Sequence, residues 1–214
     1  MPLEFNTPEG SFSLDPQRLV IAGWTGRDSA AVHHHIEELA AIGVTPPSTV
    51  PLYYEVSPAL ATQADTITVL GDKTSGEVEP LLLRHAGRLY LGIGSDHTDR
   101  GLEAQSVAHS KQICPKVIGR DLWPLEAVAD RLDTLRLHCR TEAGLYQDGT
   151  LAAIRPLGEL LASAALEDGA LMLCGTLAAI GGVRPAARYD MALEGPGGDA
   201  IALSYRVQTL SVVA

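Results

Sequence analysis

The pattern of apolar and polar positions predicts many short strands. Short apolar or alternating runs are bounded by glycine, proline or charged residues, and runs of four to eight residues are typical of strands. A hairpin is expected over Gly144 to Thr150 with Gln147-Asp148-Gly149 at its tip. The other expected strands are residues 19–23, 52–56, 66–70, 77–83, 89–94, 135–140 and 171–175, and two in the tail from Tyr189, on either side of Gly195-Pro196-Gly197-Gly198.

Helical spacing is confined to a few segments. Apolar residues at 32, 36 and 39 predict a helix that begins at Asp28 or Ser29, either of which can cap it, and ends near Ala41 before Gly43. Further helices are expected at 102–112, 124–131 and 157–165, and the proline-rich residues 45–51 predict an extended loop. Because strands and helices do not alternate regularly, we expect a β-rich α+β fold.

Composition narrows the class of protein. The 214 residues suit one ordinary domain, and 46% hydrophobic against 20% charged residues allows a sizeable core. A net charge of −10 argues against a nucleic-acid partner, which needs a basic surface. No apolar stretch reaches the roughly 18 residues of a membrane helix, and the N-terminus lacks the features of a signal peptide. Three cysteines without a CxxC pair argue against a disulfide scaffold and a zinc knuckle, so a cytoplasmic protein is expected.

Carboxylates supply the candidate chemistry. Glu77 and Glu79 are two apart in a predicted strand, so both project from one face about 7 Å apart at the backbone. Like charges this close raise each other's pKa unless a cation lies between them, although such a pair alone is more often a solvated strand face. Asp96, in a polar loop, would complete an all-oxygen set suited to Mg²⁺ or Mn²⁺. A turn or cap role is an equal alternative for Asp96.

From about Gly26 to Val207, the order of short motifs resembles the fumarylacetoacetate hydrolase superfamily. Gly26-Arg27 precedes a His-x-x-Glu pair, matched by His35 and Glu38. Three matches follow: the Glu77/Glu79 pair; the segment 95–100, whose second residue, Asp96, would be the ligand; and Lys111 before Cys114-Pro115. A Gly-Thr turn after a buried strand is similar to Gly175-Thr176. Pro80 after the glutamates, a longer stretch before His35 and a shorter interval from Asp96 to Lys111 indicate an outlying branch, which resembles the family known as DUF2848.

The resemblance implies a single catalytic domain over residues 1–214, with mixed β-sheets rolled around a metal site and a few flanking helices. Residues 1–50 would form N-terminal strands and a helical lid, and 51–214 a β-rich metal-binding core. The implied activity is hydrolase or lyase cleavage of a C–C bond in a small 2-oxo or 1,3-dicarbonyl acid, acylpyruvate-like, through a metal-stabilised enolate. Mg²⁺ or Mn²⁺ would be the cofactor, and the protein a homodimer. A decarboxylase, hydratase, isomerase, C–N hydrolase or metal-free binding protein on the same scaffold are the alternatives.

The same resemblance assigns roles to single residues. His35, oriented by Glu38, would activate a water, although two polar residues on a solvated helix explain the pair equally well. Lys111 would stabilise the enolate or a substrate carboxylate; otherwise it is a surface lysine. Arg100 would pair with Glu77 or Asp96 or simply seal its loop, and it is expected at the substrate. Gln147 and Thr176 are expected there too, although a tight turn alone explains Thr176 equally well. Cys114 is expected to be buried and structural.

Overall fold

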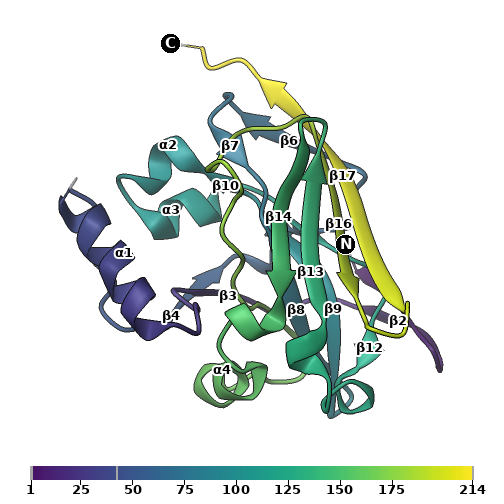
Figure 1. Cartoon of the computed structure of the whole chain (residues 1–214). Coiled ribbons are helices and arrows are strands. Elements are labelled where there is room, and N and C mark those ends of the chain that lie inside the picture. The colour runs from purple at the N-terminus through teal and green to yellow at the C-terminus, as the bar shows by residue number, and fades with distance from the viewer. Residues whose placement is uncertain (1, 42, 214) are drawn as a thin grey trace.

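Two β-sheets form the body of the molecule in the computed structural model, which describes residues 2–41 and 43–213 (Figure 1). The larger sheet contains both parallel and antiparallel pairs. Its strands, in spatial order, are β4 (Leu52–Val56), β3 (Arg18–Gly23), β15 (Ala170–Leu173), β8 (Val78–His85), β9 (Arg88–Asp96), β11 (Lys116–Ile118) and β5 (Ala61–Thr62), with β12 (Trp123–Pro124) beside β9.

The second sheet lies across one face of the first (Figure 1). In spatial order it contains β14 (Gly144–Thr150), β13 (Arg136–Thr141), β16 (Arg188–Glu194), β17 (Ala200–Leu210) and β6 (Thr66–Leu70). Two further antiparallel pairs are β1 (Leu3–Thr7) with β2 (Gly10–Leu14), and β7 (Thr74–Ser75) with β10 (Thr98–Asp99). The β1–β2 hairpin was not expected from the sequence. The β-rich α+β fold with mixed sheets is confirmed.

The larger sheet is buried on both faces, and this explains its unbroken apolar runs. Leu82 packs in the cluster between the two sheets, whereas its neighbours Leu81 and Leu83 pack on the opposite face with Phe5 of β1. Successive strand residues point to opposite faces, so a strand covered on both sides needs apolar residues at every position.

Pro80 lies inside β8 without costing a ladder bond to β9. Its carbonyl accepts from the Cys174 N–H at 3.0 Å, on the side of β15. The N and O atoms of one strand residue point to the same side, so the missing N–H faces the position just beyond Leu173, where β15 ends.

Helices are few and lie at the margins. The described residues contain four α-helices: α1 (Ser29–Ala41), α2 (Arg100–Glu103), α3 (Val107–Gln112) and α4 (Leu157–Ala164). Short 3₁₀ turns lie at Pro58–Leu60, Leu125–Ala127, Leu132–Thr134 and Leu151–Ala153. Asp28 caps α1 as expected, because its Oδ1 accepts the N–H groups of Ala30 and Ala31 at 3.0 and 3.1 Å. Figure 1 shows α1 standing off from the sheets on the same side as α2 and α3. Within the described residues, no helix has the length and hydropathy needed to cross a membrane.

Two expected helices are corrected. The helix expected at 102–112 is two short helices, because Asp99 caps α2 through the Leu102 N–H at 2.9 Å and Ser106 starts a new helix by capping α3. The helix expected at 124–131 is wrong. Trp123 and Pro124 pair with β9 instead, and only a 3₁₀ turn follows.

The expected hairpin tip is also wrong. Residues 147–149 lie within β14, which pairs with β13, and the turn falls at residues 142–143, before Gly144 with its φ of +110°. Gln147 is therefore buried inside a strand and not exposed on a loop.

Candidate metal centre

Three carboxylates meet at one end of the β8–β9 ladder. Glu79 pairs with Gly94, and two residues further along the ladder the Asp96 N–H donates to the Glu77 carbonyl at 3.2 Å. Opposite residues of an antiparallel pair share a face, so all three side chains project to the same side. One carboxylate oxygen from each lies within 4.8 Å of the others. Two local details differ from expectation: Glu77 stands just before β8, and Asp96 is the last residue of β9 and not part of a loop.

Burial makes these charges costly. Asp96 is completely buried and Glu79 nearly so. Burial, reinforced by the neighbouring Asp96 and Glu77 charges, raises the pKa of Glu79 well above its usual value. Burial alone would also raise the pKa of Asp96, but the ammonium groups of Lys111 and Lys116 outweigh it and lower that pKa.

Cations surround the three carboxylates. Lys111 donates to Asp96 Oδ2, and its Nζ lies 3.9 Å from Glu77 Oε1. The ammonium of Lys116, also completely buried, lies 2.9 Å from Asp96 Oδ1 and donates to the His97 carbonyl at 2.5 Å. Arg100 contacts Glu77 Oε2 at 2.8 Å, which selects Glu77 over Asp96 as its partner.

The donor set fits a hard divalent cation. Asp96 Oδ1 is buried and, within the part of the chain that the structure describes, accepts no hydrogen bond although Lys116 lies close by. Three carboxylate oxygens that lie within 4.8 Å of one another match the ligands that Mg²⁺ and Mn²⁺ take. Glu77, Glu79 and Asp96 are therefore the residues that would hold such an ion.

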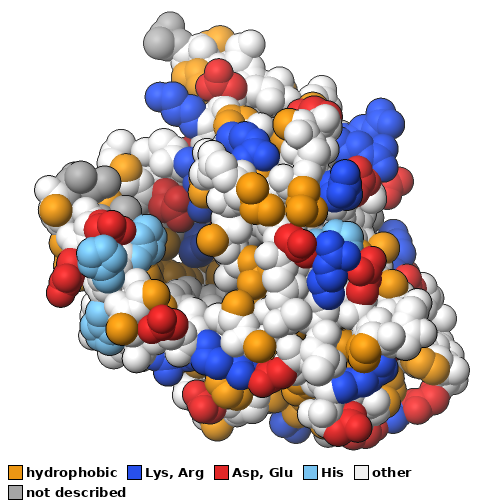
Figure 2. Space-filling view, viewed as in Figure 1, with side chains coloured by type: hydrophobic (Ala, Val, Ile, Leu, Met, Phe, Trp, Pro, Cys, Tyr) orange, Lys and Arg blue, Asp and Glu red, His pale blue; other side chains and the backbone are white. Residues whose placement is uncertain are grey.

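A cavity of about 850 Å³ opens onto the carboxylates, and Figure 2 shows the hollow between α1 and the body of the molecule. Its wall contains most of the residues expected at the site, namely His35, Glu77, Glu79, Arg100, Lys111, Gln147 and Thr176. Asp96 lies behind this wall and Glu38 lies outside it.

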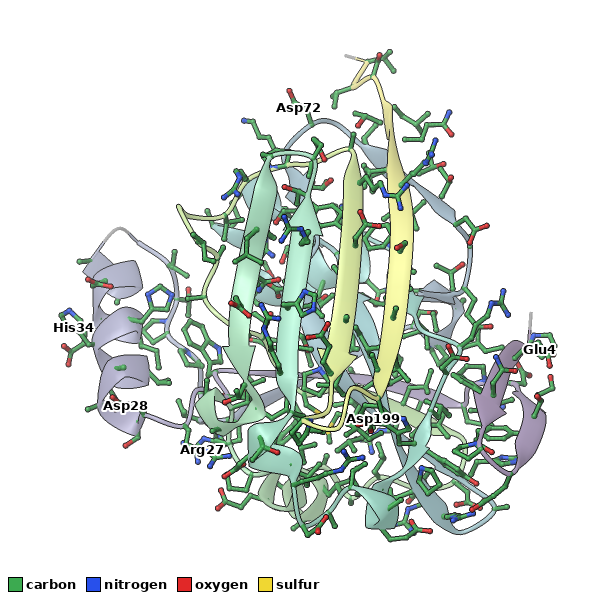
Figure 3. The ribbon with its side chains drawn as sticks, turned by 45° about the vertical axis from the view of Figure 1, so that its right-hand side comes forward. Glu4, Arg27, Asp28, His34, Asp72 and Asp199 are labelled. Carbon is green, nitrogen blue, oxygen red and sulfur yellow. The ribbon has the colours of Figure 1, made fainter. Side chains whose placement is uncertain are left out.

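Helix α1 supplies His35 to the cavity. Glu38 Oε2 lies 3.5 Å from His35 Nδ1, and Glu38 Oε1 lies 3.4 Å from Nε2 of the neighbouring His34. Figure 3 shows His34 pointing away from the body of the molecule, and it does not line the cavity. Of the two histidines beside Glu38, only His35 faces the site.

Gln147 and Thr176 fasten the cavity wall to the strand that carries the glutamates. Gln147 Oε1 accepts from the Val78 N–H at 2.9 Å, and its Nε2 donates to Thr176 Oγ1 at 2.7 Å. The Thr176 hydroxyl in turn donates to the Val78 carbonyl at 2.6 Å. Beside it, the Gly175 N–H donates to Glu79 Oε2 at 2.7 Å from a backbone with φ of +94°. A side chain at Gly175 would collide with Thr25, so only glycine fits here.

Several residues of the site were not anticipated. Lys116 holds Asp96 from behind, Glu103 shares Arg100, and Trp24 and Tyr54 line the cavity. A lone lysine between Pro115 and an apolar run was the one local signal for Lys116. Trp24 directly follows β3 and Tyr54 lies in the middle of β4, and nothing in their local sequence places them together.

His97 belongs to a buried network on the face of β9 opposite to the carboxylates. Its Nδ1 lies 3.0 Å from the Tyr205 hydroxyl, and its Nε2 lies 2.9 Å from Thr74 Oγ1. Burial, followed by the Lys116 and Arg100 charges, lowers the pKa of His97 to about 3. An unfolded histidine has a pKa of about 6.5, so between these values the unfolded chain binds the extra proton.

The free energy of unfolding should therefore fall as the pH drops below about 6.5, with His97 contributing at most about 1.4 kcal/mol per pH unit. Urea unfolding of wild type and His97→Gln at pH 7.5 and pH 5 checks this. Between the two pH values, the free energy of unfolding should fall less in the variant than in wild type. His109→Gln, at an exposed position, is the control and should behave as wild type. An identical pH dependence in wild type and His97→Gln would contradict the prediction.

Comparison with solved structures shows the same fold in several proteins. Fumarylpyruvate hydrolase from Pseudomonas aeruginosa, in complex with Mn²⁺ and pyruvate, superposes with a TM-score of 0.68 at 15% identity, over 98% of this chain and 97% of that one. A Burkholderia cenocepacia protein provisionally assigned as a fumarylpyruvate hydrolase gives 0.71 at 17% identity, over 98% and 96%. A fumarylacetoacetate hydrolase family protein from yeast gives 0.65 at 16% identity, over 91% and 94%.

Sequence comparison identifies the family. Among curated proteins, none matches this sequence. The model of the family described as protein of unknown function DUF2848 matches residues 22–205, which include all the proposed metal ligands. The resemblance drawn from the sequence motifs is confirmed for both the branch and the fold. The chain therefore belongs to the DUF2848 family, and its fold is that of fumarylacetoacetate hydrolase family proteins.

Proposed function

We propose that this protein is a divalent-metal-dependent enzyme that hydrolyses a C–C bond in a small 2-oxo or 1,3-dicarbonyl acid, such as an acylpyruvate. The observation that carries the proposal is the convergence of Glu77, Glu79 and Asp96 beside a cavity that His35 lines from α1. The structural match to an enzyme bound to Mn²⁺ and pyruvate supports this class of substrate.

The residues around the cavity divide the chemistry between them. A bound divalent ion would supply Lewis acidity to the oxygens of the dicarbonyl substrate. His35, with Glu38 against its Nδ1, would orient and deprotonate a water. Burial opposes the charge on Lys111, but Asp96, Glu77 and Glu79 outweigh it and raise the pKa of Lys111. Its ammonium would therefore keep a positive charge for the substrate carboxylate or for negative charge that develops during cleavage.

We expect His35→Ala to lower kcat by about 10²- to 10⁴-fold while leaving Mn²⁺ affinity unchanged, because the imidazole acts on water and does not hold the ion. The assay is a screen of acylpyruvates, oxaloacetate and small oxo-amides with added Mn²⁺, and Mn²⁺ affinity is measured by calorimetry. His34→Ala is the matched control, because His34 is adjacent on α1 and shares Glu38 but does not line the cavity.

The control should keep kcat within about twofold of wild type. An active His35→Ala variant, or equal losses in both variants, would remove His35 from the mechanism. Absence of turnover by the wild-type protein on every compound would overturn the proposed function.

A further inference from the structure

The cations that line the cavity are all paired. Within residues 2–41 and 43–213 there are three of them, Arg27, Arg100 and Lys111. Arg27 makes two contacts of 2.7 Å with the Asp133 carboxylate and donates to the Ile154 carbonyl at 2.8 Å. At the base of α1 it is therefore held outward (Figure 3). Its charge is not available to a ligand in the cavity.

The charge of Arg100 is likewise paired within the protein. It contacts Glu77 at 2.8 Å and Glu103 at 2.9 Å, and its Nε donates to Ser75 Oγ at 2.7 Å. Lys111 differs, because both of its ion-pair partners, Asp96 and Glu77, are proposed metal ligands, whereas Arg100 would keep Glu103 when Glu77 binds the ion. Among the described cations of the wall, Lys111 is thus the one whose charge would be free to pair with a substrate once the metal is bound. It lies beside the proposed metal ligands.

Much of the remaining wall is apolar or aromatic. Its main side chains are Trp24, Tyr54, Val107, Tyr146, Leu177 and Val183. The Trp24 Nε1–H donates to the Tyr54 hydroxyl at 3.1 Å, so the indole donor is already used. Trp24 has a φ of +62°, a left-handed conformation that bulky residues rarely adopt, and its ring lies 6.2 Å from that of His35. This strained residue presents an aromatic surface beside the proposed general base.

Charge at the wall also disfavours a second anion. Asp28 and Glu103, which are not proposed metal ligands, add negative charge to the wall. Among the described residues that line the cavity, no cation is left for a second carboxylate, and burying an unpaired charge is strongly unfavourable. Arg184, next to Val183 but outside the wall, lies over the Tyr146 ring and donates to the Ile180 and Gly182 carbonyls.

Building on the proposed function, we infer that the substrate is a monocarboxylate. Its one charge would be the carboxylate beside the carbonyl at the metal end, held by Lys111. The rest of the substrate would be uncharged and apolar, packed against wall residues such as Trp24 and Val183. The site therefore selects acylpyruvates with a neutral acyl group over those whose acyl group ends in a carboxylate.

Two compounds of matched shape test this inference. In 4-methylpentanoylpyruvate an isopropyl group takes the place of the terminal carboxylate of succinylpyruvate. With Mn²⁺ bound, the wild-type enzyme should cleave the neutral-tailed compound with a kcat/KM at least tenfold higher. Equal values, or a preference for succinylpyruvate, would overturn the inference and leave the proposed function standing.

A lysine placed in the apolar part of the wall should change this preference. Val183 lines the cavity and is 55% exposed, so Val183→Lys adds a cation there without disturbing the core. In the variant, the ratio of kcat/KM for the neutral-tailed compound to kcat/KM for succinylpyruvate should be at least fivefold smaller than in wild type. Ile180→Lys is the matched control, because Ile180 lies in the same segment at 48% exposure but outside the cavity wall. It should keep the wild-type ratio, and an equal change in both variants would count against the inference.

Absence of cleavage of either compound would defeat the proposed function separately. Calorimetric titration of the Mn²⁺-loaded protein with the same two compounds then decides the inference by itself. At least tenfold tighter binding of the neutral-tailed compound supports it, and equal or weaker binding overturns it.

Discussion

Asp96→Ala is expected to lower the free energy of unfolding by about 3–5 kcal/mol, because it leaves buried ammonium groups without their counter-ion. Asp96 and Lys116 are both completely inaccessible to solvent, and Lys111 is almost so. Within the described parts of the chain, Asp96 is the one carboxylate that pairs with Lys116. Removing it strands a charge that water cannot reach.

Urea unfolding without added metal measures this loss. Asp148→Ala is the control, because Asp148 pairs with Arg136 at 2.7 Å on the surface and such pairs contribute about 1 kcal/mol or less. The double variant Asp96→Ala/Lys116→Met should recover part of the lost stability, since the stranded charge is then gone. A loss below about 1 kcal/mol for Asp96→Ala would show that the lysines reach solvent or other partners.

The sequence predicts an element well where a single feature, such as burial on both faces, sets its pattern of apolar residues. Strands β3, β8 and β15 were predicted because burial on both faces requires unbroken apolar runs. The helix expected at 124–131 failed because pairing of Trp123 with Leu91 of β9, a tertiary contact, decides that segment. The β1–β2 hairpin was missed although Leu3 and Phe5 alternate with exposed residues, a period-two pattern that the sequence contains.

The residues of the candidate site also fall into those that the sequence predicted and those that it did not. Their spacing predicted that Glu77 and Glu79 share a face, and the polar segment after a strand suggested Asp96, which the motif order then selected. Lys116 and Trp24 were missed because their roles depend on which strands become neighbours. The expected homodimer stays a prediction.

Mn²⁺ at about 100 times its Kd is expected to stabilise the wild-type protein by about 2.7 kcal/mol. For a chain of this size, that corresponds to a rise of roughly 5–11 °C in the melting temperature. In Glu79→Gln this rise should vanish, because one of the three converging carboxylates is gone, and Mn²⁺ affinity should fall at least about 100-fold, a loss of about 2.7 kcal/mol.

Without metal, the same substitution should leave stability unchanged or raise it. Burial and the charges of Asp96 and Glu77 raise the pKa of Glu79, so its ionised form destabilises the metal-free fold above the usual glutamate pKa. A glutamine has no charge to bury and can still accept the Gly175 N–H through its Oε1. Higher metal-free stability together with loss of the metal response is a combination that a merely structural role for Glu79 would not produce.

Scanning calorimetry with and without Mn²⁺, and titration calorimetry, measure both effects. Glu103→Gln is the matched control, because Glu103 lines the same cavity but pairs with Arg100 and lies outside the group of three carboxylates. It should keep the wild-type response to Mn²⁺. If Glu79→Gln retains the full thermal shift, the ion is not held by this cluster, and a reaction centred on Glu77, Glu79 and Asp96 is excluded.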